Sequence, residues 1–160
     1  MQIKFPFNST KPIAGEATID IDKPLAEVFS FVGEQFFDNY PKWAVEIVDF
    51  EALDGKSVFI GARARQVRKD SDTPIESVFA ITEYQPKVKL IFKGLSEPYK
   101  HSYLMEGNEK IPPTRLTFRF ELLDLDIFMR PFEKLIRYAI EEGAENTVEN
   151  IKKLIAAECN

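Results

Sequence analysis

Several residue types on which common functional sites depend are scarce in this sequence. The 160 residues include one histidine, His101, and one cysteine, Cys159, which stands next to the C-terminus. A lone cysteine cannot form an internal disulfide, and one histidine with one cysteine cannot build a His/Cys zinc site. The seven glycines are dispersed, so the glycine motifs that bind phosphates or dinucleotides are missing. We therefore expect neither a metal site nor a cofactor.

The chain also lacks a basic cluster and a long apolar run. Twenty-one basic and twenty-six acidic residues give a net charge of −5, which argues against nucleic-acid binding and against attraction to anionic lipid. No stretch approaches the roughly 18 apolar residues that a membrane-spanning helix requires. The N-terminus has no apolar core of a signal peptide. We expect a cytoplasmic protein without a transmembrane segment.

The length and composition are those of one globular domain. Hydrophobic residues make up 44% of the chain and charged residues 29%, which are ordinary values for a globular protein. No repeat, low-complexity tract or linker interrupts the sequence. We expect a single domain over residues 1–160, in which residues 1–12 form an N-terminal arm or edge strand.

The first part of the chain predicts a strand followed by two short helices. Residues 13–21 alternate between apolar and polar side chains, as a half-buried strand does. A helix is expected to begin with Asp22 as its cap and Pro24 in its first turn, and to end at Gly33. A second short helix follows and is expected to stop at Pro41.

The middle of the chain predicts an antiparallel meander. Apolar segments separated by turn residues place strands at 43–52, 57–67, 75–84, 87–93, 99–106 and 114–123. Asp54-Gly55, between the first two segments, is typical of a tight hairpin. The regular spacing of short strands favours consecutive antiparallel pairing.

The C-terminal part predicts one long helix from about residue 130 to 158. It contains no proline after Pro131, and apolar or small residues recur on one face over about seven turns. This stripe consists of Leu135, Ala139, Ile140, Gly143, Thr147, Ile151, Leu154 and Ile155. A helix with one such stripe is expected to pack on the sheet.

Short motifs in this order are familiar from one superfamily. They are Ile19-Asp20 before Pro24, Glu27-Val28-Phe29, Tyr40-Pro41-Lys42-Trp43, Ile60-Gly61-Ala62-Arg63, Glu83-Tyr84-Gln85-Pro86 and Thr114-Arg115-Leu116-Thr117. Over residues 13–157 the sequence resembles the START-like superfamily, also called the polyketide-cyclase or helix-grip group. Pro113 departs from the pattern, because relatives usually have glycine at that place.

The resemblance implies an α+β helix-grip fold. In this fold a curved antiparallel sheet of about six to seven strands wraps around one long C-terminal helix, and two short helices follow the first strand. A cavity between sheet and helix is implied for lipids, polyketides or similar hydrophobic molecules. The superfamily has no universal catalytic set, so the resemblance assigns no catalytic residue.

Strand alternation predicts which side chains face this cavity. On 57–67 the more apolar parity is Val58, Ile60, Ala62 and Ala64, and on 87–93 it is Val88, Leu90 and Phe92. The ligand-binding candidates are Trp43, Ile60, Ala62, Phe92, Tyr99, His101, Tyr103, Leu116, Phe118, Phe120, Ala139, Gly143 and Thr147. Ordinary core packing is the alternative for each. Glycine inside a helix costs up to about 1 kcal/mol against alanine, so Gly143 indicates either room for a ligand or close helix packing.

Three functions are compatible with this pattern. The preferred one is binding of a hydrophobic small molecule by a monomer or homodimer without catalysis. The second is a cyclase- or dehydratase-like enzyme that uses Tyr99, His101 and Tyr103 to orient a carbonyl or move a proton; the alternative for His101 is a hydrogen-bonded or peripheral position. The third is a protein-interaction module of the chaperone-activator kind, which the charges expected on the outer sheet face argue against.

Overall fold

A seven-stranded antiparallel sheet forms the frame of the molecule. The computed structural model describes residues 12–69 and 72–158, so the arm predicted for 1–12 lies almost entirely outside the described residues. The strands are β1 (Ile13–Ile21), β2 (Ile47–Ala52), β3 (Arg63–Arg68), β4 (Ile75–Gln85), β5 (Lys89–Gly94), β6 (Tyr99–Gly107) and β7 (Thr114–Leu122). Their order is β1-β7-β6-β5-β4-β3-β2. The meander from β2 to β7 is therefore completed by the first strand, which pairs with the last.

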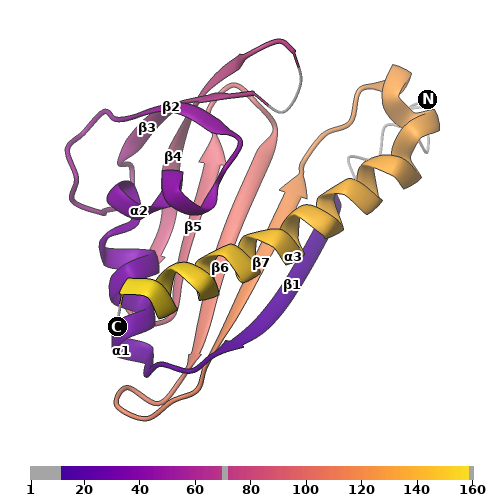
Figure 1. The fold of residues 1–160 in the computed structure, drawn as a ribbon. Helices are drawn as coiled ribbons and strands as arrows, with labels where there is room; N and C mark the ends of the chain where they lie inside the picture. Colours follow the sequence, from indigo (N-terminus) through magenta and orange to yellow (C-terminus); the bar gives the residue numbers. More distant parts are fainter. Residues whose placement is uncertain (1–11, 70–71, 159–160) are drawn as a thin grey trace, which may run out of the picture.

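Helices cover one face of this sheet. They are α1 (Leu25–Phe29), the π-helical turn η2 (Ser30–Glu34), α2 (Phe36–Trp43), the 3-10 helix η3 (Ile127–Phe132) and α3 (Glu133–Glu158). In Figure 1, α3 runs obliquely across the sheet, and its C-terminal end lies beside α1 and α2. The prediction of an α+β helix-grip fold, with a curved sheet and one long C-terminal helix, is confirmed.

Strands β6 and β7 show the alternation that the sequence predicts. In their register His101 is opposite Phe120, and Tyr103 is opposite Phe118. His101, Tyr103 and Phe118 are buried, and Phe120 is partly buried. These strands therefore present a largely aromatic surface to the helices.

The closely packed part of the core lies under α2 and the C-terminal half of α3. The ring of Phe79 stacks on Phe92 with centroids 4.0 Å apart, and Phe36 of α2 lies 5.6 Å from Phe92. Trp43 Nε1 donates a hydrogen bond of 3.1 Å to the Tyr103 hydroxyl. The buried residues that α3 contributes are Ala144, Val148, Ile151 and Ile155.

The predicted boundaries of the first two helices were wrong. Pro24 occupies the N-cap position of α1, and no side chain caps this helix, so Asp22 does not have the predicted role. Gly33 lies inside η2, where a Cβ would come within 2.5 Å of the Phe29 ring. Pro41 lies inside α2, which continues to Trp43. Burial of the Trp43 side chain against the sheet outweighs the backbone hydrogen bond that proline removes.

The predicted hairpin at Asp54-Gly55 has a longer loop than the sequence suggested. Strand β2 begins at Ile47 instead of Trp43, and β3 begins at Arg63 instead of residue 57. The Asp54 carboxylate accepts hydrogen bonds from the backbone N–H and the guanidinium of Arg63, which closes the loop at that residue. Ile60 therefore lies in the loop with 64% of its surface exposed, and its predicted inward orientation was wrong.

Other side chains that were predicted to face the sheet–helix interior also differ from the prediction. Ala62 and Ala64 are buried as predicted, whereas Val88 precedes β5 and is exposed. On α3 the predicted stripe is partly wrong, because Leu135, Ala139 and Gly143 are exposed. The helix approaches β1 at Gly15, where a Cβ would lie 2.5 Å from Ile140 Cγ2. This close approach turns the face that contains Ile140 and Ala144 toward the sheet.

Candidate functional site

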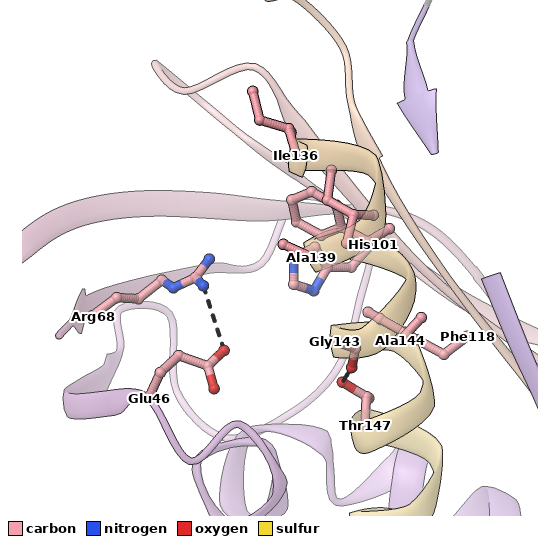
Figure 2. Close-up of a pocket in the computed structure, with 11 residues that line it drawn as sticks. Glu46, Arg68, His101, Phe118, Ile136, Ala139, Gly143, Ala144 and Thr147 are labelled. Carbon is pink, nitrogen blue, oxygen red and sulfur yellow. Dashed lines mark hydrogen bonds and ion pairs between the residues drawn. The ribbon is translucent and has the colours of Figure 1, made fainter. Parts of the chain in front are cut away.

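A groove lies between the sheet and the N-terminal half of α3 (Figure 2). Its volume is about 340 Å³, within the range of small-molecule sites in proteins. The groove is lined by Glu46, Arg68, His101, Phe118, Phe120, Ile136, Ala139, Ile140, Gly143, Ala144 and Thr147. Most of these side chains are apolar, and they come from β3, β6, β7, α3 and the connection before β2.

Small residues on α3 keep the groove open. Gly143 has no atom within 4 Å of the position that a Cβ would occupy, so this glycine borders open space. Ala139, one turn earlier on the helix, also lines the groove. Of the two explanations that the sequence left for Gly143, the structure supports room beside the helix and contradicts close packing.

The floor of the groove is aromatic. The His101 ring lies 4.4 Å from the Phe92 ring, 4.9 Å from Phe120 and 5.4 Å from Phe118, measured between centroids. Antiparallel pairing of β6 and β7 places His101 and Phe120 directly opposite each other. The imidazole is therefore fixed among aromatic rings, and it is the polar group of this floor.

His101 is buried without a hydrogen-bond partner. Only 7% of its surface is exposed, and neither Nδ1 nor Nε2 has a partner among the described residues. Burial lowers the pKa of His101 to about 3, and the nearby Arg68 guanidinium acts in the same direction. The imidazole is therefore neutral near pH 7 and offers one N–H donor and one acceptor nitrogen. Buried polar groups in proteins nearly always have a partner, so an imidazole that has none among the described residues is unusual.

An ion pair stands on the other side of the groove. Arg68 Nη2 lies 3.6 Å from Glu46 Oε1, and Figure 2 shows both side chains across the open space from α3. Thr147 also lines the groove, but its hydroxyl donates a 2.8 Å hydrogen bond to the Gly143 carbonyl of its own helix. The other polar side chains that line the groove are His101 and the Arg68–Glu46 pair.

The predicted ligand-binding residues fall into three groups. Those that line the groove are His101, Phe118, Phe120, Ala139, Gly143 and Thr147. Those buried in the core beyond it are Trp43, Ala62, Phe92, Tyr99, Tyr103 and Leu116. Ile60 lies exposed in the β2–β3 loop. The groove thus brings Phe118 and Phe120 of β7 and the three α3 candidates together with His101.

The two tyrosines beside His101 use their hydroxyls elsewhere. The Tyr103 hydroxyl accepts from Trp43 Nε1, and the Tyr99 hydroxyl is 3.0 Å from Ser77 Oγ and 3.3 Å from Gln66 Nε2. Burial raises the pKa of both tyrosines. Neither tyrosine lines the groove, so the structure does not assemble the hypothetical catalytic trio around a common space.

Several residues that line the groove were not predicted from the sequence. They are Glu46, Arg68, Ile136, Ile140 and Ala144. Arg68 has the same strand parity as Ala62 and Ala64, so extending that alternation would have found it. Glu46 lies in the irregular connection between α2 and β2, where no periodicity applies.

Among residues 12–69 and 72–158, no group of three or more His, Cys, Asp or Glu side chains could hold a metal ion. No helix in the described part of the chain is long and apolar enough to cross a membrane.

The structure is thus a helix-grip fold with a largely apolar groove under its long helix. The family model for polyketide cyclase/dehydrase and lipid transport matches residues 12–156. The chain therefore belongs to this family. A search among curated proteins finds no match.

Solved structures show the same fold at low sequence identity. The Zhui aromatase/cyclase from Streptomyces sp. R1128 has a TM-score of 0.74 at 8% identity, covering 94% of this chain and 97% of its own. A protein from Thermus thermophilus has a TM-score of 0.73 at 14% identity, with 92% and 99% coverage. Norcoclaurine synthase from Thalictrum flavum, in complex with a transition-state analogue, has a TM-score of 0.69 at 10% identity, with 94% and 99% coverage. At these identities the likeness establishes the fold alone.

Proposed function

We propose that this protein binds a small hydrophobic molecule that carries a hydroxyl or carbonyl group, with its apolar body in the groove under α3. The observation that carries the proposal is the buried His101 ring on the otherwise aromatic floor of the groove. Neither of its two nitrogens has a partner among the described residues. Family membership supports a hydrophobic ligand.

A buried polar group without a partner costs about 1–3 kcal/mol. A ligand whose polar group hydrogen-bonds to His101 regains part of this cost, while its apolar body gains from contact with Phe118 and Phe120. A purely apolar ligand obtains only the second contribution. The groove should therefore prefer the molecule with the polar group.

Binding without catalysis is favoured over a cyclase-like reaction. A general base works best when its pKa lies near the working pH, and the pKa of His101 is lowered to about 3. The neighbouring Tyr99 and Tyr103 do not line the groove. His101 is thus suited to hydrogen bonding with a ligand rather than to proton abstraction.

The test compares two probes of nearly equal shape, naphthalene and 2-naphthol, by titration followed with protein NMR. We expect wild type to bind both, with 2-naphthol tighter by up to about tenfold. The variant His101→Phe should keep naphthalene binding and lose the preference. Native mass spectrometry of the purified protein, followed by extraction, then identifies any natural ligand.

The possible results separate the parts of the proposal. If neither probe binds and no ligand is extracted, the groove is not a hydrophobic site. Equal affinity for the two probes in wild type would mean that the groove accepts apolar molecules without using His101. Conversion of an extracted ligand into a product by wild type, lost in His101→Phe, would place the enzyme alternative first.

A further inference from the structure

Two charged side chains, Arg68 and Glu46, line the otherwise largely apolar groove. Arg68 Nη2 lies 3.6 Å from Glu46 Oε1, whereas charge-assisted hydrogen bonds between such groups are usually about 2.7–2.9 Å long. The Arg68 side chain is 30% exposed and that of Glu46 is 35% exposed. The two formal charges cancel, so their sum does not determine which sign of charge a ligand should have.

The place of Arg68 relative to His101 does determine it. Figure 2 shows the Arg68 guanidinium and the His101 imidazole pointing toward each other across the open space. Burial is the main cause of the low pKa of His101, the Arg68 guanidinium lowers it further, and no carboxylate of the described residues opposes this effect. At the imidazole the positive charge of Arg68 therefore outweighs the negative charge of Glu46. An anionic group placed there is attracted, and a cationic group is repelled.

Arg68 can bind a second carboxylate while it keeps Glu46. A guanidinium has five N–H donors in a planar fork. Arg65, on the opposite face of the same strand, donates to three carboxylates at once, which are those of Asp49, Glu51 and Glu76. The neutral imidazole of His101 has one further N–H donor. A charge that leaves water must be paired and hydrogen-bonded, and Arg68 and His101 together meet this need for a carboxylate.

We propose that the ligand of the groove is a hydrophobic carboxylic acid, bound as its anion with the carboxylate between Arg68 and His101. Its apolar body lies against Phe118 and Phe120. This inference rests on the proposed function, since it names the polar group of the same ligand. A free carboxylate gains from the charge of the guanidinium, whereas the corresponding amide or alcohol gains hydrogen bonds only.

The test compares 2-naphthoate, 2-naphthamide and 2-naphthylmethylammonium, which share one ring system and differ in charge. Each compound is titrated into the full chain and followed by protein NMR, beside naphthalene as the probe of the apolar groove alone. We expect wild type to bind 2-naphthoate at least about tenfold more tightly than 2-naphthamide, the effect of hydrogen bonds to a charged group. The ammonium compound should bind more weakly than the amide.

Two substitutions on β3 separate the effect of Arg68 from that of the overall charge. Arg68→Gln should reduce the ratio of the affinities for 2-naphthoate and 2-naphthamide to about one. Arg65→Gln is the matched control, because it removes the same charge from the opposite face of the strand and should keep the wild-type ratio. If Arg68→Gln does not unfold cooperatively like wild type, Glu46→Gln replaces it. That variant removes the competing carboxylate and should raise the ratio roughly threefold or more.

The possible results distinguish this inference from the proposed function. Binding of naphthalene without a preference for 2-naphthoate would overturn the acid and leave the apolar groove in place. Tightest binding of the ammonium compound would instead assign cationic ligands to the groove. A preference for 2-naphthoate that persists in Arg68→Gln, disappears in Arg65→Gln or stays unchanged in Glu46→Gln would show that the Arg68–Glu46 pair is not its source. Failure of every probe, naphthalene included, would contradict the proposed function and this inference together.

Discussion

At the scale of single residues, His101 makes stability depend on pH. Its pKa is about 3 in the folded protein and about 6.5 when it is free of the fold. The unfolded chain therefore binds the proton first, and the free energy of unfolding falls as the pH drops from about 6.5 to about 3. The fall amounts to at most about 1.4 kcal/mol per pH unit.

Denaturant unfolding between pH 7 and pH 4 tests this dependence. Carboxylates titrate in the same window, so the useful quantity is the difference between wild type and His101→Phe. We expect wild type to lose stability more steeply than the variant. Parallel pH profiles would show that the imidazole is protonated equally easily in the folded and unfolded states.

Substitution by alanine is expected to change stability in opposite directions at two glycines. Gly143→Ala meets open space and removes the entropic cost of glycine in a helix, so it should stabilise the protein by up to about 1 kcal/mol. Gly15→Ala places a methyl group 2.5 Å from Ile140 Cγ2 and 2.8 Å from the backbone of Glu141, so it should destabilise. Thermal unfolding of the two variants measures both effects.

A larger side chain at Gly143 tests the groove directly. Gly143→Leu should fill part of the open space and weaken naphthalene binding while the protein stays folded. Full naphthalene affinity in Gly143→Leu would place the probe elsewhere. Gly143→Ala is the control for any change that comes from helix propensity alone.

At the scale of elements, the two halves of α3 differ in how closely they pack on the rest of the molecule. Ile151, in the C-terminal half, is completely buried, and Asn150 Nδ2 donates a hydrogen bond of 3.1 Å to the Trp43 carbonyl of α2. Leu135, in the first turns, is exposed. Ile151→Ala should therefore cost about 2–5 kcal/mol, and Leu135→Ala less than about 0.5 kcal/mol. Chemical denaturation measures the free energy of unfolding of both variants. Equal losses of stability would mean that both halves of α3 pack on the sheet.

The sequence predicted some elements better than others for physical reasons. The alternation on β6 and β7 identified Tyr99, His101, Tyr103 and Phe118 as inward because a strand has an exact period of two. Boundaries near Pro41 and Ile60 were wrong, since burial of Trp43 and the Asp54–Arg63 contacts outweigh local turn preferences. In both cases specific side-chain contacts of the folded chain decided the boundary.

At the scale of the whole molecule, the side of α3 that faces the sheet could not be derived from its own pattern. Apolar residues occur on two adjacent stripes, and the close approach at Gly15 selects the one that contains Ile140 and Ala144. The other stripe, with Leu135, Ala139 and Gly143, is left beside the groove or in solvent.

The last prediction concerns the dependence of the whole fold on α3. Truncation after Pro131 removes the buried residues of this helix and uncovers the inner face of β7, where Leu116 and Phe118 are buried in the complete chain. An apolar sheet face open to water favours aggregation, so the truncated chain should be insoluble or should unfold without cooperativity. The matched comparison is Ile151→Ala, which should stay soluble and melt cooperatively at a lower temperature. Calorimetry and size-exclusion chromatography follow both variants, and a soluble, cooperatively melting truncation would show that the sheet is stable without the helix that lies across it.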